Sequence, residues 1–190
     1  LLQLLGQLQP AQSLVFCNTK IDCQNVEQHL AKAGFDVCAL HGDLEQRDRD
    51  EAMVRFQNAS VRVLVATDVA ARGLDVSDLP LVFSYELAHQ ADVHVHRVGR
   101  TGRAGKDGQA LALVASGEMA RVKAIEEQMG MTARWQRLDL SSIKLAPLKA
   151  EWKTLVIDAG RKDKLRPGDI LGALTAKQAI DGKAVGKIAL

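Results

Sequence analysis

The sequence predicts an α/β fold built on a doubly wound, mainly parallel sheet. Short apolar runs alternate with longer helix-like stretches along most of the chain. Most of these runs are continuously apolar, which is typical of parallel strands that are buried on both faces. Polar residues follow three of the runs directly. This order favours a sheet with helices on both faces, joined by right-handed crossovers.

The first part of the chain contains five predicted strands and four predicted helices. The short Leu-rich start, residues 1–10, is expected to be a piece of helix or the end of a linker. Gly34 and Gly130 follow two of the helices, where a C-cap glycine is expected. The predicted strands are Leu14–Cys17, Val37–Leu40, Val61–Ala66, Leu81–Tyr85 and Gln109–Ala115, and the predicted helices are Lys20–Ala33, Leu44–Asn58, Asp92–Val98 and Glu118–Gln128.

A second, smaller unit is predicted at the end of the chain. The alternation weakens near Leu140, and the turn-forming residues that follow indicate a linker over residues 139–150. Beyond it, we expect a strand over Trp152–Ala159, a basic loop, a helix that begins at Pro167, and the start of another strand over Gly186–Leu190. The domains are therefore predicted at residues 11–138 and 151–190, and the second cannot bury much core alone.

Composition excludes several classes of protein. The chain has 190 residues and a formal net charge of only +2, so nucleic-acid binding has to be argued from local clusters. Its three cysteines lack the spacing of zinc ligands and indicate buried, reduced thiols, so no metal site is expected. No apolar run approaches the ~20 residues of a membrane span, and no signal peptide is recognisable. We expect a cytoplasmic protein with no membrane contact.

Polar clusters lie where three apolar runs end. Asn18-Thr19 follows the first run, His41-Gly42-Asp43 the second, and Thr67-Asp68 the third. In open α/β sheets ligands bind beyond the carboxyl ends of the strands, so these clusters predict a shared ligand edge. The alternative interpretation is three unrelated helix caps.

A second candidate is the basic stretch from His96 to Lys106, which contains no acidic residue. His96, Arg100 and Arg103 are spaced i, i+4 and i+7, which would place them on one face of a helix, although Gly99 and Gly102 interrupt it. The alternative is a solvated surface, but such surfaces normally mix charges. Guanidinium groups bind phosphate in a bidentate manner, so the pair of arginines is a candidate phosphoryl clamp that acts as arginine fingers.

The sequence lacks a phosphate-binding loop of its own. No Gly-x-x-x-x-Gly-Lys-Ser/Thr is present, and no strand ends in an acidic pair fit to hold magnesium. Asp50-Glu51-Ala52-Met53 lies within a predicted helix and is interpreted as a coincidental match. This chain alone is therefore expected to be inactive as an ATPase.

These segments together resemble the second RecA-like lobe of DEAD-box RNA helicases. Ser13–Thr19 resembles motif IV, His41–Phe56 includes a segment similar to motif IVa, Ala66–Asp75 matches motif V, and His96–Arg103 matches motif VI. The resemblance covers residues 11 to 135. It implies a RecA-like, P-loop NTPase-type sheet in an ATP-dependent RNA helicase, whose N-terminal RecA-like lobe would be the partner of this one.

The resemblance also implies a role for each matching residue. Arg100 and Arg103 would reach the ATP γ-phosphate, with magnesium held mainly by the first lobe, and Asp75 would contact the ribose. His96 would couple nucleotide state to lobe closure, while Asp68 and Arg72 would link motifs V and VI. The residues implied to contact the RNA sugar-phosphate backbone are Asn18 or Thr19, Gly42, Arg49 and Thr67.

Residues 151–190 resemble the start of the RRM-like RNA-binding domain of DbpA-type bacterial helicases, most clearly over Leu155–Leu174. That resemblance implies a truncated α+β segment and a partner in 23S rRNA during assembly of the large ribosomal subunit, on pre-50S particles. The basic residues Arg161, Lys162, Lys164 and Arg166 are candidate RNA contacts or, alternatively, a solvated loop. Two rival functions remain: a lobe of another superfamily 2 helicase, and an RNA-binding module without enzymatic activity.

Overall fold

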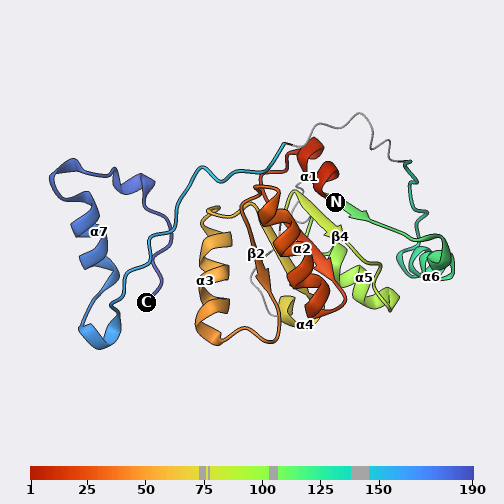
Figure 1. Ribbon diagram of the computed structural model, residues 1–190, viewed down its shortest axis with the longest axis horizontal. Helices are drawn as coiled ribbons and strands as arrows, with labels where there is room; N and C mark the ends of the chain where they lie inside the picture. Colours follow the sequence, from red (N-terminus) through yellow and green to blue (C-terminus); the bar gives the residue numbers. More distant parts are fainter. Residues whose placement is uncertain (73–75, 77, 103–106, 138–145) are drawn as a thin grey trace.

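The computed structural model describes residues 1–72, 76, 78–102, 107–137 and 146–190, and a five-stranded parallel sheet forms its centre (Figure 1). The strand order is β2-β3-β1-β4-β5. The predicted fold class is confirmed. The strands are β1 Ser13–Cys17, β2 Val37–Leu40, β3 Val63–Thr67, β4 Leu81–Ser84 and β5 Gln109–Ala112.

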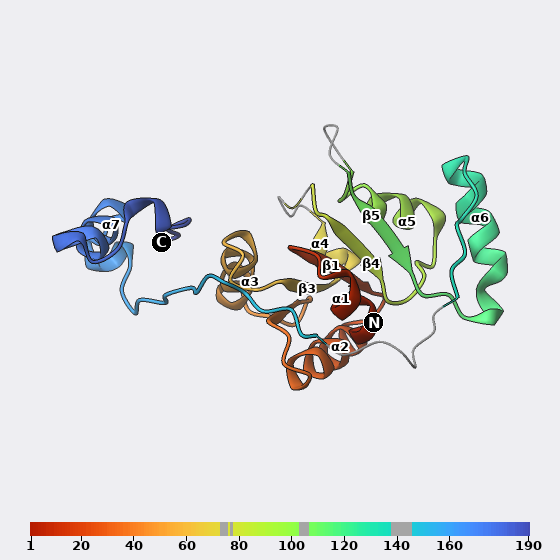
Figure 2. The same cartoon turned by 90° about the horizontal axis from the view of Figure 1, so that it is seen from above.

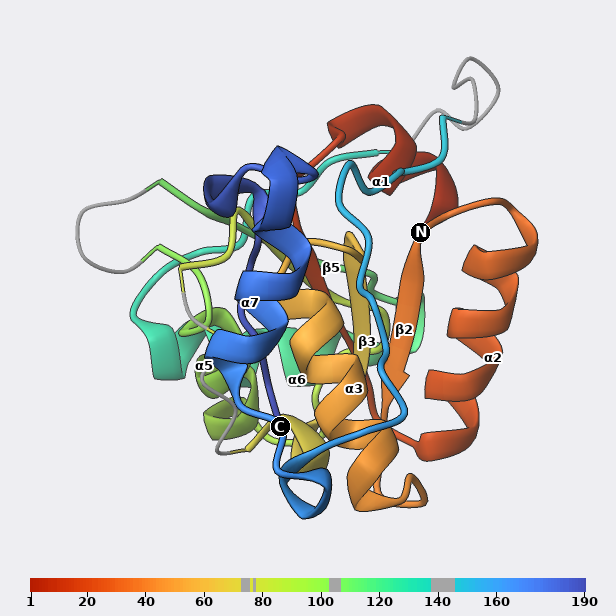
Figure 3. The same ribbon diagram turned by 90° about the vertical axis from the view of Figure 1, so that its left-hand side faces the viewer.

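Helices cover both faces of this sheet because alternate residues of each strand are apolar on opposite sides. Leu14 and Phe16 of β1 belong to a core cluster with α3, while Val15 and Cys17 belong to a second cluster with α1 and α2. Figure 3 shows α2 and α3 on opposite faces. The helices are α1 Leu2–Leu8, α2 Lys20–Lys32, α3 Gln46–Gln57, α4 Asp68–Ala71, α5 Ala91–Val98 and α6 Met119–Met129.

The two ends of the sheet differ. Helix α6 packs on α5 through Val122 and Ile125, together with Leu87 from the loop after β4. Figure 2 shows α6 at one end of the molecule, with α5 and β5 between it and α3. Helix α4 was not predicted, because four residues give too short a pattern to recognise. None of the helices within the described residues has the length and apolarity needed to cross a membrane.

The described end of the predicted linker, residues 146–150, packs against the lobe. Leu148 is 0% exposed within the α2-side core cluster. Its carbonyl oxygen accepts a hydrogen bond from the Asp36 backbone N–H at 2.9 Å, and the Ala150 N–H donates to the Asp36 carboxylate at 2.6 Å. Arg62 Nη1 donates to the Lys149 carbonyl at 2.9 Å. Residues 146–150 are therefore fixed to the lobe by buried contacts and hydrogen bonds.

The strands predicted for Trp152–Ala159 and Gly186–Leu190 are wrong: neither range forms a strand in the described structure. A strand needs a partner for its backbone hydrogen bonds, and no other strand of the described residues lies beside these ranges. Apolar side chains of Leu155 and Val156 are exposed as a result. The helix predicted from Pro167 is confirmed as α7, Pro167–Thr175; short 3-10 turns occur at Arg161–Asp163, Ala176–Gln178 and Gly182–Ala184.

Candidate nucleotide and RNA interface

The carboxyl ends of four neighbouring strands meet at one edge of the sheet. The parallel pairing places Cys17 beside Thr67, Leu40 beside Ala66, and Phe16 beside Ser84. The residues that follow these strands therefore lie side by side at this edge, as predicted for three of the strands. The fourth strand adds Glu86, which lies two residues after β4 and was not predicted as a site residue.

Arg97 lies at the centre of a buried hydrogen-bond network at this edge, and its side chain is 1% exposed. Nε and Nη2 donate to the two carboxylate oxygens of Asp68, each at 2.8 Å, which makes a bidentate ion pair. Nη1 donates to the carbonyl of Glu86 at 2.7 Å, and Nη2 also donates to Asn18 Oδ1 at 2.7 Å. The guanidinium lies 5.2 Å from the centre of the Phe16 ring.

This network joins segments that follow β1, β3 and β4 to α5. Asn18 donates its backbone N–H to Glu86 Oε2 at 2.9 Å and its side-chain Nδ2 to the Leu87 carbonyl at 3.1 Å. Both groups of the Asn18 amide are therefore bonded within the lobe. The Asp68 side chain bonds to Arg97, whereas Arg72 is exposed one turn further along. Arg97 fixes the relative positions of the four segments.

The other predicted RNA contacts differ in their exposure and in the bonds that they make within the lobe. Thr19 is the N-cap of α2, where its hydroxyl accepts the Asp22 N–H at 3.1 Å, so it acts as a helix cap at the ligand edge. Gly42 is exposed and has open space around its Cα. Arg49 is half-buried in α3, and Thr67 is 9% exposed and precedes α4.

His41 connects the end of β2 to helix α2. Its side chain is 4% exposed, and its Nε2 lies 3.2 Å from Gln24 Nε2 of α2. Its Nδ1 is buried without a partner among the described residues. Beside it, Lys20 and Asp43 form an exposed ion pair at 2.8 Å. These contacts hold the turn at Gly42 against the start of α2.

The second basic candidate is only partly described. Helix α5 ends at Val98, so Arg100 lies beyond the helix rather than on its face. The Arg100 carbonyl accepts the Leu79 N–H at 3.1 Å, and its Nη1 donates to the Val76 carbonyl at 3.4 Å. His96 is exposed on α5. Arg103 and Asp75 lie outside the described residues.

Burial changes the chemistry of several side chains. It raises the pKa of Cys23 to about 11 and that of Cys38 to about 12, and it raises the pKa of Cys17 as well. These thiols stay protonated at neutral pH, so they are poor nucleophiles. Burial, and secondarily the charge of Arg97, lowers the pKa of His94. Among the residues that the structure describes, no group of three or more His, Cys, Asp or Glu residues is arranged to hold a metal ion.

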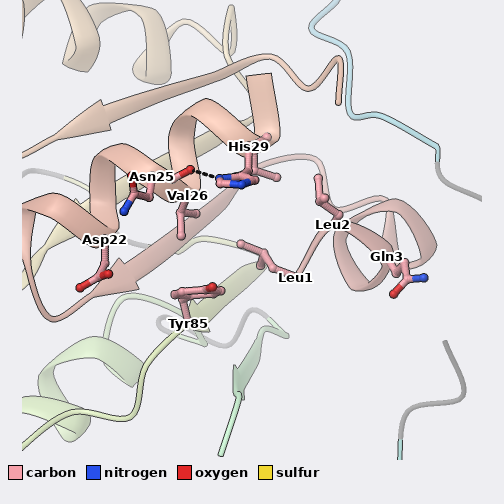
Figure 4. Close-up of a pocket in the computed structure, with 9 residues that line it drawn as sticks. Leu1, Leu2, Gln3, Asp22, Asn25, Val26, His29 and Tyr85 are labelled. Atoms are coloured by element: carbon pink, nitrogen blue, oxygen red, sulfur yellow. Dashed lines mark hydrogen bonds between the residues drawn. The ribbon is translucent and has the colours of Figure 1, made fainter. Parts of the chain in front are cut away.

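A hollow of about 750 Å³ lies beside α2, and none of the residues that line it bonds to Arg97 (Figure 4). Figure 4 shows Tyr85, Leu1 and Val26 around it, with His29 bonded to the Asn25 carbonyl at 2.6 Å. None of the residues that line it is a lysine or an arginine. This hollow is therefore unsuited to hold a phosphate group.

The basic residues of the C-terminal segment are exposed. Arg161, Lys162 and Lys164 lie in or beside a 3-10 turn, and Arg166 is the N-cap residue of α7. No carboxylate within the described ranges forms an ion pair with any of the four. Their charge is therefore available to an anionic partner.

The five-stranded parallel sheet, with helices on both faces and polar residues at its carboxyl edge, has the architecture of a RecA-like lobe. The family description "Helicase conserved C-terminal domain" matches residues 1–105, and "DbpA RNA binding domain" matches residues 154–190. The chain belongs to the DEAD-box ATP-dependent RNA helicases.

Individual relatives agree with this assignment. The chain is 52% identical over 188 residues to the ATP-dependent RNA helicase DbpA of Escherichia coli, a match that covers 99% of this chain and 41% of that protein. It is 41% identical over 129 residues to the DEAD-box helicase RhpA of Helicobacter pylori, covering 68% of this chain and 26% of that protein. The chain therefore spans less than half the length of these curated relatives.

Solved structures show the same lobe. E. coli DEAD-box protein SrmB, in its complex with regulator of ribonuclease activity A, matches with a TM-score of 0.68 and 31% identity, over 82% of this chain and 88% of that chain. A DEAD-box protein from Methanococcus jannaschii matches with a TM-score of 0.62 and 39% identity, over 68% of this chain and 36% of that one.

Proposed function

We propose that this chain is the second RecA-like lobe, with the beginning of an RNA-binding domain, of an ATP-dependent RNA helicase that remodels or unwinds short RNA duplexes. The Arg97 network carries the proposal. It ties the segment that leads to Arg100 to the same sheet edge as Gly42 and Thr67. One edge of the sheet thus presents both the residues that we propose to contact the nucleotide and those that we propose to contact RNA.

The nucleotide half of the proposal assigns the arginines to the transferred phosphoryl group. When the lobes close, Arg100 and Arg103 approach the γ-phosphate of ATP bound to the first lobe, and Asp75 contacts the ribose. Phosphoryl transfer spreads negative charge over the equatorial oxygens, and fixed guanidinium groups stabilise that charge. Magnesium would be held mainly by the first lobe. His96, exposed on α5, would sense closure.

The RNA half assigns the other end of the edge to the sugar-phosphate backbone. Gly42 leaves space for a close approach, and Arg49 and Thr67 offer a positive charge and a hydroxyl. Thr19 offers a second hydroxyl. Asn18 enters the proposal as a residue that holds Arg97. Contacts of this kind carry no sequence information, as a general remodelling activity requires.

Lobe closure would couple the two halves. Because Asp68 and Arg97 join motifs V and VI within the lobe, a shift at the nucleotide would move the RNA edge with it, and Arg72 would extend this link toward the first lobe. Closure on ATP and RNA would bend and locally strip a duplex, and product release would reopen the lobes.

The C-terminal segment would supply target recognition. Its support is the match to the DbpA RNA-binding domain and the exposed cluster of Arg161, Lys162, Lys164 and Arg166. Guanidinium and ammonium groups provide the phosphate contacts that dominate RNA affinity. The target we propose is 23S rRNA in pre-50S particles, which places the protein in ribosome biogenesis in the cytoplasm.

RNA-stimulated ATP hydrolysis by the full-length enzyme tests the nucleotide assignment. Arg100→Ala is expected to lower turnover by about 10³-fold, because an arginine finger contributes on that order. Arg134→Ala, an exposed arginine in the segment after α6, serves as the matched control and is expected to retain full turnover. Unchanged turnover in Arg100→Ala, with the control intact, would contradict the arginine-finger role.

Two further comparisons separate the rival functions. The isolated 190-residue chain is expected to show no ATPase, since it lacks a phosphate-binding loop; hydrolysis by the pure chain would contradict this. Stimulation of the full enzyme by RNA but not DNA distinguishes it from another superfamily 2 motor. RNA binding by a full-length protein that hydrolyses no ATP would instead support a binding module without activity.

A further inference from the structure

Gly108 lies against the end of motif VI, immediately before β5. A Cβ atom at Gly108 would overlap the hydroxyl oxygen of Thr101, and it would lie 2.8 Å from the backbone nitrogen of Gly102 and 3.1 Å from Thr101 Cβ. Gly117, a few residues further along, has nothing within 4 Å of the same position. The close approach at Gly108 is thus specific to the contact with Thr101 and Gly102.

The atoms that Gly108 touches are held from the other side. Thr101 is 8% exposed, and its hydroxyl donates to the carbonyl of Leu79. The Leu79 N–H donates to the Arg100 carbonyl at 3.1 Å, and Leu79 and Thr101 form a parallel bridge. The segment cannot move away from Gly108 without breaking these bonds. The overlap that a side chain at Gly108 would create can therefore be relieved only by a shift of the backbone.

Leu79 and Pro80 hold the chain on both sides of the contact between Gly108 and Thr101. Pro80, next to Leu79, accepts the Gln109 N–H at 3.0 Å. Leu79 and Pro80 thus bond to Arg100 on one side and to the residue after Gly108 on the other. The position of Arg100 depends on how closely Gly108 and Thr101 pack between these bonds.

We propose that Gly108 is a positioning residue for Arg100: its lack of a side chain lets the end of motif VI pack directly on the start of β5. This inference rests on the proposed function of Arg100 as an arginine finger. Gly108 itself touches neither nucleotide nor RNA. Its effect passes through the backbone of Arg100, Thr101 and Gly102.

The size of the effect follows from the distances. An ordinary van der Waals contact begins near 3.4 Å, so Gly108→Ala must lengthen the 2.8 Å approach to Gly102 N by about 0.6 Å. A misplacement of about 1 Å at a reacting group costs on the order of 10²-fold in rate. We therefore expect kcat to fall by about tenfold or more. The KM for ATP should change less, because the lost interaction is made mainly in the transition state.

The experiment compares Gly108→Ala with Gly117→Ala in the full-length enzyme. RNA-stimulated kcat, KM for ATP, RNA affinity and Tm are measured for each. The expected result is a fall of about tenfold or more in kcat for Gly108→Ala only, with RNA affinity unchanged, because Gly42 and Thr67 lie beyond other strands. A purely structural role would lower Tm without separating kcat from KM.

A second variant approaches the contact from the other side. Thr101→Val keeps the shape of the side chain but removes the hydroxyl that bonds to Leu79, so it loosens the segment without an overlap. It is expected to lower kcat with little change in KM, and it serves as the test if Gly108→Ala does not fold. The positioning role would be overturned if folded Gly108→Ala had wild-type kcat while Arg100→Ala was inactive. If only Thr101→Val folds, wild-type kcat in that variant would overturn it. Full turnover in Arg100→Ala would instead overturn the proposed function itself.

Discussion

Replacement of Arg97 by methionine tests the network that positions the candidate site. Arg97 is fully buried and donates four hydrogen bonds, to Asp68 twice, to the Glu86 carbonyl and to Asn18. Methionine fills much of the same volume but donates none of them. The change leaves a carboxylate and two further acceptors without their partner, so the lobe should lose stability rather than only activity.

The magnitude follows from the burial of the pair. Removing one partner of a buried ion pair costs about 3–5 kcal/mol, because the other charge is left uncompensated. The Asp68 side chain retains 24% exposure, so water can reach part of its carboxylate and the lower end of that range applies. We expect the free energy of unfolding to fall by about 3 kcal/mol. For a domain of this size, that lowers Tm by about 6–12 °C.

Urea unfolding of the 190-residue chain, followed by far-ultraviolet circular dichroism, measures the effect. Arg72→Met is the matched control, because Arg72 is exposed on the same sheet edge and should change stability by less than about 0.5 kcal/mol. Combining Asp68→Asn with Arg97→Met should cost less than the two single changes added together. A loss below about 1 kcal/mol in Arg97→Met would refute the view that this arginine holds the edge together.

Three further results are expected. Leu148→Ala should destabilise the lobe by about 3 kcal/mol in urea unfolding, since Leu148 is fully buried, whereas the exposed Leu8→Ala should cost less than about 1 kcal/mol; equal losses would mean that residues 146–150 are not part of the core. The folded pKa of Cys38, about 12, exceeds its ordinary value of 9.0, so its proton is lost first from the unfolded chain and stability should fall above pH 9. By pH 10 the loss from this thiol is about 1.4 kcal/mol, and Cys38→Ala should remove that share of the pH slope. Thr19→Ala should cost about 1 kcal/mol through the lost cap of α2, and an unchanged unfolding midpoint would contradict the capping role.

The sequence predicted the sheet well because its strands are buried on both faces. A continuous apolar run such as residues 63–66 of β3 has few alternatives in an α/β chain, and the polar residues that follow it mark its end. The same reasoning failed at Trp152–Ala159, whose centre, residues 155–157, is also apolar. A helix makes its hydrogen bonds within one segment, as α7 does, but a strand exists only if another strand pairs with it. Composition alone does not show whether that partner is present.

The position of the candidate site was predictable from the sequence. The strand-end rule found Asn18, Thr67 and Asp68, and the family resemblance implied that Asn18 or Thr19 contacts RNA. Neither indicated that the Asn18 side chain bonds to Arg97 within the lobe. Glu86 also follows a predicted strand, so the same rule, applied to a fourth strand end, would have found it. Arg97 gave no such signal. Its burial depends on long-range contacts with Asp68 and Asn18, 29 and 79 residues away, which no local pattern encodes.

The basic stretch of motif VI therefore contains arginines of two kinds. Arg97 is buried and donates four hydrogen bonds within the lobe, so it cannot turn toward a ligand without breaking them. Arg100, three residues later, lies beyond the helix end that Arg97 fixes. A guanidinium stabilises a transition state only if its position is set before the reaction, since reorganising it during the reaction would cost the energy that it contributes. In the mechanism that we propose, this lobe meets the nucleotide only on closure, so no bound phosphate orders its arginines beforehand. Arg97 on one side and Gly108 on the other can supply that order from within the fold.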